Sequence, residues 1–251
     1  MILNIFKIMQ FKKIYLIKIL VSLISGVAHE QEGFILSNYG VFLKKNFSDR
    51  TFRLCLQGYR NGLEIILRDL KQEFIFIDVG ANQGIFSILA SKNSKCTQIH
   101  AFEPNPKLME FLEKNFMFNK VKNSTIHQLA LSNLNGKVNF STWDSHSGIG
   151  RIDAKNGNIL VDVVNRKYLN KVFRNSLPNM FLKIDAEGSE LIILKEFFGS
   201  KVASSIKFIF IEIDPKFNQS KEVTQLLSQN GFTLTARASG GGNFDHFYTK
   251  V

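Results

Sequence analysis

Two segments about a hundred residues apart share a pattern that constrains the fold more than any other feature of the chain. They read Phe76-Ile-Asp-Val-Gly-Ala-Asn-Gln-Gly84 and Leu182-Lys-Ile-Asp-Ala-Glu-Gly188. Each is typical of an apolar strand that ends in an acidic residue and enters a helix through a glycine. Because ligands of α/β sheets bind at the carboxyl ends of parallel strands, the pair predicts a cofactor beside the first strand and chemistry beside the second.

Strand and helix patterns alternate along most of the chain. Short apolar runs predict buried strands over residues 51–56, 74–79, 98–102, 125–129, 180–185 and 205–213. Apolar residues three or four apart predict helices over residues 62–70, 84–91, 107–118, 189–198 and 219–229. Such alternation is typical of a parallel sheet with helices on its faces.

Two regions depart from this alternation. Residues 136–142 and 158–164 read as short strands on either side of a polar loop, residues 143–150. Residues 232–236 and 244–250 read as strands joined by a glycine-rich stretch, which is typical of a hairpin. The predicted fold is therefore α/β, with a Rossmann-like, mostly parallel seven-stranded sheet and an antiparallel hairpin at its C-terminal edge.

Residues 1–50 are predicted to form a helical extension, and residues 51–251 a single domain. Residues 2–28 are rich in Ile, Leu and Phe, but four lysines interrupt them. After Lys18 the uncharged run ends at His29, well short of the ~20 residues that a membrane-spanning helix needs. We expect a helix packed on the domain, with weak attachment to a membrane surface as the alternative.

Composition indicates a globular protein of a reducing compartment. The chain is 45% hydrophobic and 21% charged, which excludes wholesale disorder. The net charge of +11 fits a polyanionic partner, a membrane surface or an acidic substrate, but the longest basic runs are pairs, which favours a generally basic surface. Cys55 and Cys96 lack pairing or metal-ligand spacing. We therefore expect a cytoplasmic protein, either free or peripheral to the inner face of the membrane.

The first segment favours a cofactor that carries both a positive charge and a ribose. Ala81 stands where the dinucleotide pattern G-x-G-x-x-G needs a glycine, and Asp78 would repel a pyrophosphate. An acidic strand end suits a cationic group such as the α-amino group of a methionine moiety. Glu103 lies about 20 residues beyond Gly84, the spacing at which a carboxylate binds ribose hydroxyls. S-adenosyl-L-methionine satisfies both conditions.

Four stretches of the chain resemble FkbM-type methyltransferases. They are FIDVGANQGIFS at 76–87, AFEP at 101–104, ALS at 130–132 and LKIDAEGSE at 182–190. The resemblance spans about residues 50–250 and implies a class I fold, S-adenosyl-L-methionine as cofactor, and O-methylation of a hydroxyl on a sugar, glycolipid or secondary metabolite. Where the family usually shows a Thr-Leu-Asp-like stretch, this chain reads Val164-Asn-Arg166-Lys-Tyr-Leu169.

The resemblance also implies roles for single residues. By motif match, the cofactor site would be lined by Asp78, Gly80, Asn82, Gly84 and Glu103. Ala130 and Ser132 would lie near the adenine. The acceptor would be a small molecule or a glycan that presents a hydroxyl group.

Methyl transfer from a sulfonium is a direct displacement, so the enzyme must align the acceptor oxygen and help remove its proton. Asp185 ends the second strand, and Lys183 points to the same face two residues earlier. We expect the lysine to favour the charged form of that carboxylate. Glu187 follows in the turn and is the other candidate for the base. A structural ion pair with a helix cap is the alternative interpretation of all three.

Further polar residues extend the predicted site. Glu212 and Asp214 end the next strand and, with Asp185, offer the oxygen ligands that a divalent cation such as Mg²⁺ prefers. Solvent-exposed carboxylates are the alternative. His146 lies with the only Trp, Trp143, in the polar loop, which we expect to cover the acceptor cleft. Since a histidine titrates near neutral pH, His146 is a further catalytic candidate, and a solvated loop histidine is the alternative.

Two other functions are compatible with such a fold. A nucleic-acid methyltransferase fits the charge, but the second strand ends in Asp-Ala-Glu-Gly rather than in an aromatic clamp or a nucleophilic cysteine. We therefore expect no nucleic-acid partner. A non-catalytic scaffold held at the membrane is disfavoured by the intact acidic and glycine positions.

Overall fold

The computed structural model describes residues 30–59, 61–173, 178–238 and 244–250. The helix expected over residues 2–28 lies outside these ranges. Within them, no helix is both long enough and apolar enough to cross a membrane.

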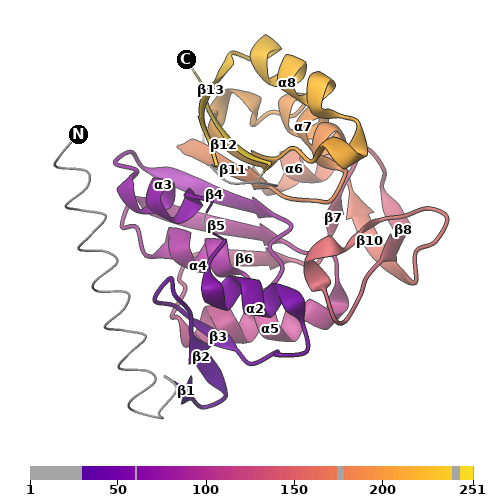
Figure 1. Ribbon diagram of the computed structural model, residues 1–251. Helices are drawn as coiled ribbons and strands as arrows, with labels where there is room; N and C mark the ends of the chain where they lie inside the picture. The colour runs from indigo at the N-terminus through magenta and orange to yellow at the C-terminus, as the bar shows by residue number, and fades with distance from the viewer. Residues whose placement is uncertain (1–29, 60, 174–177, 239–243, 251) are drawn as a thin grey trace.

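The core of the protein is one twisted seven-stranded sheet (Figure 1). Its strands, from edge to edge, are β13 (Phe232–Arg237), β14 (Asp245–Lys250), β12 (Ile206–Glu212), β11 (Asn179–Ile184), β4 (Phe74–Val79), β5 (Cys96–Phe102) and β6 (Ser124–His127). Every neighbouring pair is parallel except the two pairs that β14 makes. The predicted α/β sheet with a C-terminal edge hairpin is confirmed, and its reversed strand is β14, one position in from the edge.

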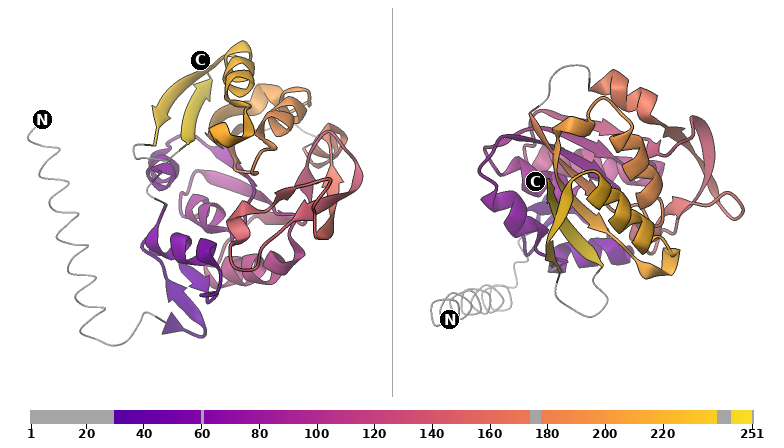
Figure 2. Two further views of the ribbon diagram at one scale, coloured as in Figure 1. Left: turned by 45° about the vertical axis from the view of Figure 1, so that its right-hand side comes forward. Right: turned by 90° about the horizontal axis from the view of Figure 1, so that it is seen from above.

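Both faces of the sheet are covered by helices, as Figures 1 and 2 show. Strand β4 is buried along its whole length, and its side chains alternate between two cores. One core includes Phe74 and Phe76 and is completed by α2 (Arg50–Gln57), α3 (Leu63–Asp69), α4 (Ile85–Ser91) and α5 (Pro106–Phe118). The other includes Ile75 and Ile77 and is completed by α6 (Arg166–Val172), α7 (Glu190–Phe198) and α8 (Ser220–Gln229).

Two small sheets flank this core. The first, β1 (Glu30–Gln31), β2 (Phe34–Leu36) and β3 (Phe42–Lys44), lies against α5. The second has the order β7 (Ala130–Leu131), β10 (Ile159–Val164), β8 (Gly136–Ser141) and β9 (Arg151–Ile152). Three 3₁₀ turns complete the described elements: η1 (Ser147–Ile149), η2 (Ala203–Ser205) and η3 (Pro215–Phe217).

The region before residue 58 differs from its prediction. Residues 30–44, part of the predicted helical extension, form strands, because Val41 and Leu43 are buried in the core and α5 side chains bind the backbone of β3. Residues 51–56, predicted as a strand, belong to α2. Asp49 caps this helix by accepting a hydrogen bond from the backbone N–H of Thr51. Helix α6 was not predicted.

Candidate functional site

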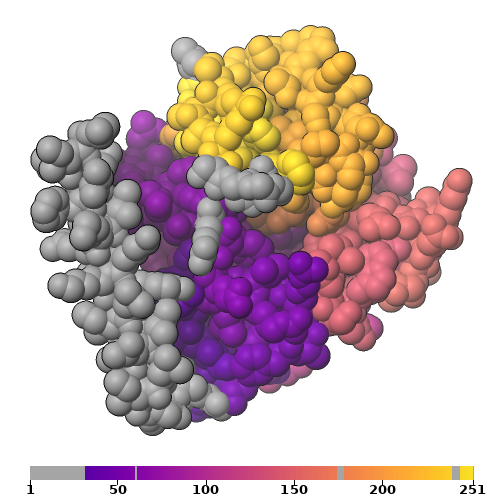
Figure 3. Space-filling view, viewed as in Figure 1, coloured from indigo at the N-terminus to yellow at the C-terminus, as the bar shows by residue number. Residues whose placement is uncertain are grey.

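The two strand-end segments, residues 76–84 and 182–188, meet in one cavity at the carboxyl end of the sheet. The cavity measures about 240 Å³ and is lined by the turn after β4, the end of β5, the residues around β7, the turn after β11, the end of β12, helix α2 and the loop at 146–150. Figure 3 shows a recess between the indigo N-terminal elements, the orange C-terminal elements and the salmon small sheet. The turns after β4 and β11 and the ends of β5 and β12 are the strand ends predicted to carry function, and helix α2 and the loop at 146–150 complete the lining.

The turn after β4 needs glycine at position 80 for a reason beyond conformation. Gly80 has φ 77°, and a Cβ atom built on it would lie 1.8 Å from the backbone oxygen of Asp185. The turn after β4 therefore lies directly against the turn after β11. Gly84, with φ 83°, serves packing instead, because its Cβ would lie 2.5 Å from Leu112 and 2.7 Å from Phe116. Gly84 does not line the cavity.

Asp78 is buried beneath the cavity and is not part of its lining. One carboxylate oxygen accepts a hydrogen bond of 2.7 Å from the hydroxyl of Ser87, and the other lies 3.2 Å from Nζ of Lys183. The predicted contact between Asp78 and a ligand amino group stays a prediction: in this structure the carboxylate is fully buried and its two oxygens lie against Ser87 and Lys183. The sheet register, in which Lys183 is opposite Asp78, explains the pairing.

Lys183 joins the two strand ends. Its Nζ donates a 2.8 Å hydrogen bond to the backbone oxygen of Gly80 and lies 3.6 Å from a carboxylate oxygen of Asp185. Burial alone would disfavour the ammonium, but Asp78 and Asp185 outweigh it and raise the pKa of Lys183. A charged lysine is thus fixed at the floor of the cavity.

Glu103 lines the cavity at the end of β5. Its carboxylate accepts hydrogen bonds from the backbone N–H groups of Asn82, at 2.8 Å, and Asn105, at 2.9 Å. Burial raises the pKa of Glu103 to about 7, although these two hydrogen bonds oppose the shift. Gly80, Asn82, Glu103 and Ala130, all predicted to bind the cofactor, line the cavity together. Ser132 does not, and its hydroxyl bonds the neighbouring Asn133.

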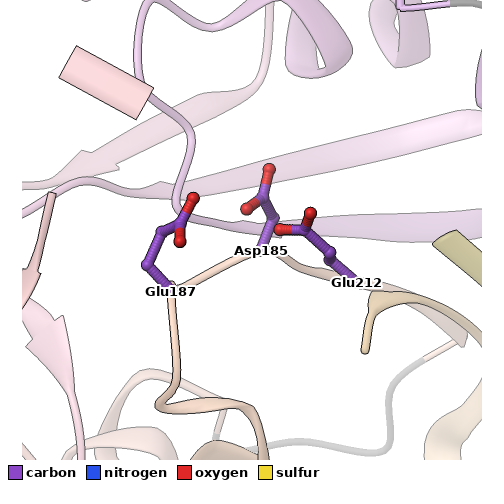
Figure 4. Close-up of side chains that lie close together, drawn as sticks. All are labelled: Asp185, Glu187 and Glu212. Atoms are coloured by element: carbon purple, nitrogen blue, oxygen red, sulfur yellow. The ribbon is translucent and has the colours of Figure 1, made fainter. Parts of the chain in front are cut away.

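Three carboxylates meet at the other end of the cavity (Figure 4). Asp185, Glu187 and Glu212 each place a carboxylate oxygen within 4.8 Å of the other two. Burial, followed by the charge of Asp185, raises the pKa of Glu212 to about 9. Burial and the neighbouring Asp185 thus favour the protonated form of the Glu212 carboxyl. Burial also raises the pKa of Glu187.

Asp214 does not join this cluster. Its side chain caps η3 through the backbone N–H of Lys216, and its other oxygen lies 2.6 Å from Nζ of Lys216. A second ion pair links Lys216 to Glu187 at 3.0 Å. The set of carboxylates that could meet a cation is therefore Asp185, Glu187 and Glu212, and not the predicted set with Asp214.

The polar loop lies over the turn after β4 rather than over the three carboxylates. Lys107 in α5 pairs with Asp144 at 2.7 Å, and Ser147 reaches the amide of Asn82 at 3.0 Å. His146 lines the cavity, and burial, followed by Arg50, lowers its pKa. The loop therefore covers the predicted cofactor end of the cavity.

Sequence reasoning missed two groups of residues. Helix α2 lines the cavity with Thr51, Leu54 and Cys55, and the wrong strand prediction for residues 51–56 hid this face. Asp245, at the start of β14, lies opposite Glu212, and burial followed by the charge of Asp185 raises its pKa to about 6. The rule that ligands bind at the carboxyl ends of parallel strands pointed to Glu212 but not to Asp245, because Asp245 starts an antiparallel strand and reaches the same edge of the sheet only through the pairing of β14 with β12.

The sheet order, with a glycine turn after the inner strand β4 and acidic residues at neighbouring strand ends, defines the class I methyltransferase fold. A model of the methyltransferase FkbM domain matches residues 78–234. The chain belongs to this family. No curated protein gives a significant match.

Solved structures that resemble the chain include several methyltransferases. A ribosomal protein L11 methylase from Lactobacillus delbrueckii subsp. bulgaricus is 15% identical over 75% of this chain and 76% of that one, with a TM-score of 0.46. A precorrin-6y C5,15-methyltransferase from Geobacter metallireducens GS-15 is 14% identical over 76% of this chain and 87% of that one, with a TM-score of 0.45. A putative tRNA (m1A22) methyltransferase from Streptococcus pneumoniae, in complex with S-adenosyl-L-methionine, is 16% identical over 75% and 71%, with a TM-score of 0.46.

Proposed function

We propose that the protein is an S-adenosyl-L-methionine-dependent O-methyltransferase that acts on a hydroxyl of a sugar, glycolipid or secondary metabolite. The observation that carries the proposal is that one cavity holds two different chemistries. Gly80, Asn82 and Glu103, which we call the donor end, and the carboxylates of Asp185, Glu187 and Glu212, which we call the acceptor end, line the same cavity, and the turn at Gly80 lies against the turn at Asp185. A methyl donor and an acceptor hydroxyl would therefore meet in one cavity.

The donor end fits a nucleoside that carries an amino acid. Glu103 is held at the strand end where a carboxylate binds ribose hydroxyls, and each of its oxygens keeps a free lone pair beside its backbone hydrogen bond. The left-handed turn at Gly80 and Asn82 brings the backbone close to the ligand, and Ala130 offers a small apolar contact for the base. When bound, S-adenosyl-L-methionine supplies a methyl group on a sulfonium.

The acceptor end supplies a proton acceptor. Asp185 lines the cavity with a side chain that is 41% exposed, whereas burial and the charge of Asp185 raise the pKa of the neighbouring Glu212 and favour its protonated form. Asp185 is therefore the carboxylate suited to accept the proton of the attacking hydroxyl as the new C–O bond forms. Lys183 fixes its position from below. As a second candidate mechanism, Asp185, Glu187 and Glu212 would hold a divalent cation, which would lower the pKa of the acceptor hydroxyl so that its proton is lost more easily.

A nucleic-acid acceptor is disfavoured by the same chemistry. The acceptor end of the cavity is acidic, and a phosphate backbone would be repelled by its carboxylates. The scaffold alternative needs no cofactor at all. It therefore predicts no binding of S-adenosyl-L-methionine, whereas a nucleic-acid methyltransferase would bind the cofactor and methylate a nucleic acid.

Titration calorimetry with S-adenosyl-L-methionine is the first test, and an absence of binding would contradict the proposal. The second is incubation with labelled cofactor and candidate glycans, glycolipids or RNA, followed by mass spectrometry to locate the methyl group.

Asp185→Asn should bind cofactor normally and lose turnover. Asp78→Ala should weaken cofactor binding indirectly, because Lys183 loses its buried partner. Chelation of divalent ions should leave turnover unchanged if Asp185 accepts the proton, and a loss of turnover would favour the cation instead.

A further inference from the structure

Asp49 is a buried carboxylate outside the family-matched region that contacts the donor end of the cavity. It is fully buried and precedes residue 78, where the family match begins. Its four hydrogen bonds come from three separate parts of the chain. One oxygen accepts from the backbone N–H groups of Thr51, at 2.9 Å, and Ser147, at 3.0 Å. The other accepts from the side chains of Gln83, at 2.9 Å, and Ser147, at 2.6 Å.

These bonds fasten helix α2 to the polar loop. The backbone N–H of Gly148 donates to the hydroxyl of Thr51 at 2.7 Å, and that of Arg50 donates to the oxygen of Ser145 at 2.8 Å. Gly148 needs to be glycine, because a Cβ there would lie 2.9 Å from the same hydroxyl. Thr51, Ser147 and Gly148 all line the cavity. Helix α2 and the loop at 146–150 therefore form one roof over the turn after β4.

A chain of hydrogen bonds runs from Asp49 to Glu103. Ser147 donates its hydroxyl proton to Asp49 and accepts from the amide of Asn82 at 3.0 Å. The backbone N–H of Asn82 in turn donates to Glu103 at 2.8 Å. Asn82 has a left-handed backbone, with φ 51°, which Asn adopts more readily than most residues, and its side chain is held by Ser147. Asp49 thus fixes, through Ser147, the position of Asn82 beside Glu103 in the lining of the cavity.

Among the described residues, no cationic side-chain nitrogen forms an ion pair within 4 Å of the Asp49 carboxylate. Its charge is stabilised by four donors and by the N-terminus of α2. A buried carboxylate without a cation is costly unless every donor is in place, so the arrangement ties the position of the loop to that of the helix.

We propose that Asp49 is a positioning residue for cofactor binding, through which the segment before the family-matched region becomes a required part of the donor site. This inference rests on the proposed function. Asp49→Asn keeps the size and the helix cap but replaces one acceptor oxygen with an NH₂ group that faces two donors. We expect it to weaken binding of S-adenosyl-L-methionine about tenfold or more.

The test compares four variants with the wild-type protein by titration calorimetry and thermal unfolding: Asp49→Asn, Ser147→Ala, their double variant, and Asn165→Ala. Asn165→Ala is the stability control, because Asn165 caps α6 on the opposite face of the sheet and does not line the cavity. It should lower the Tm and leave the Kd unchanged. Ser147→Ala should weaken binding, and the double variant with Asp49→Asn should lose less than the two single losses combined, because both act through one chain of bonds.

The outcomes separate the two proposals. If the wild-type protein does not bind the cofactor, the proposed function fails. If the wild-type protein binds and a folded Asp49→Asn variant binds equally well, the positioning role fails. An equal loss of affinity in Asn165→Ala at an equal loss of Tm would also overturn it, because the effect would then follow stability alone. Hydrogen exchange at the N–H groups of Ser147 and Gly148, faster in Asp49→Asn without ligand, provides a readout independent of the cofactor.

Discussion

Replacing Gly80 with alanine should separate the two turns that build the cavity. The alanine Cβ would lie 1.8 Å from the backbone oxygen of Asp185, whereas real Cβ atoms essentially never approach closer than 3.0 Å. One turn must therefore retreat by about 1.2 Å, the difference between these two distances. The retreat strains two short hydrogen bonds, from the backbone N–H of Asp185 to Val79 and from Lys183 to Gly80.

Gly80→Ala should lower the free energy of unfolding in two ways. A left-handed φ in an L-residue costs about 1–2 kcal/mol, and forcing extra volume into a tightly packed region costs about 1–3 kcal/mol more. Gly40→Ala is the matched control, because Gly40 has φ 74° and no atom lies within 4 Å of its added Cβ. Gly40→Ala should therefore show the first part alone. Gly80→Ala should show both, and its free energy of unfolding should fall by about 3 kcal/mol or more.

Urea unfolding of the two variants measures the difference, and calorimetry with S-adenosyl-L-methionine measures its consequence for the site. We expect Gly40→Ala to bind as the wild-type protein does and Gly80→Ala to bind at least tenfold more weakly. If Gly80→Ala proves no less stable than Gly40→Ala, the close approach of the turn to Asp185 is not as described and the reasoning is wrong.

Three further predictions follow from buried ionisable groups. Lys183→Met leaves a buried carboxylate without its cation and should lower the free energy of unfolding by about 3–5 kcal/mol in urea unfolding. Burial and then Asp185 raise the pKa of Glu212 to about 9, so native stability should fall as pH rises from 4.5 to 9, and Glu212→Gln should flatten that profile. His100 and His127 contact each other at 2.9 Å, and burial lowers the pKa of each from 6.5 to about 4, so stability should fall as pH drops through this window, less steeply in His100→Gln.

The main strands could be read from the sequence because their signal is local. Strands β4 and β11 are apolar runs that end at an acidic residue and a glycine, and nothing distant is needed to place them. Helix α2 could not be read in this way. Phe52, Leu54 and Leu56 alternate as in a strand, but the cap at Asp49 and the burial of Phe52 with Cys55 select the helix.

Within the site, the rule that ligands bind at the carboxyl ends of parallel strands located the carboxylates but not their surroundings. It placed Asp185 and Glu212 beside each other because their strands are neighbours. It could not show that Asp78 is buried beneath the cavity and paired with Lys183, since that depends on the register of β4 against β11. Nor could it reveal Asp49, because the partners of this residue, Gln83 and Ser147, lie 34 and 98 positions away.

The place of β14 in the sheet has a consequence for how the chain is made. Strand β13 is synthesised first, yet its partner in the sheet is β14, which lies between it and β12. Until β14 emerges from the ribosome, β13 has no sheet position to occupy, and the apolar edge of β12, with Phe208 and Phe210, stays unpaired. An exposed edge of this kind invites association with other chains. We therefore expect nascent chains that are halted before β14 to be the most aggregation-prone form of this protein.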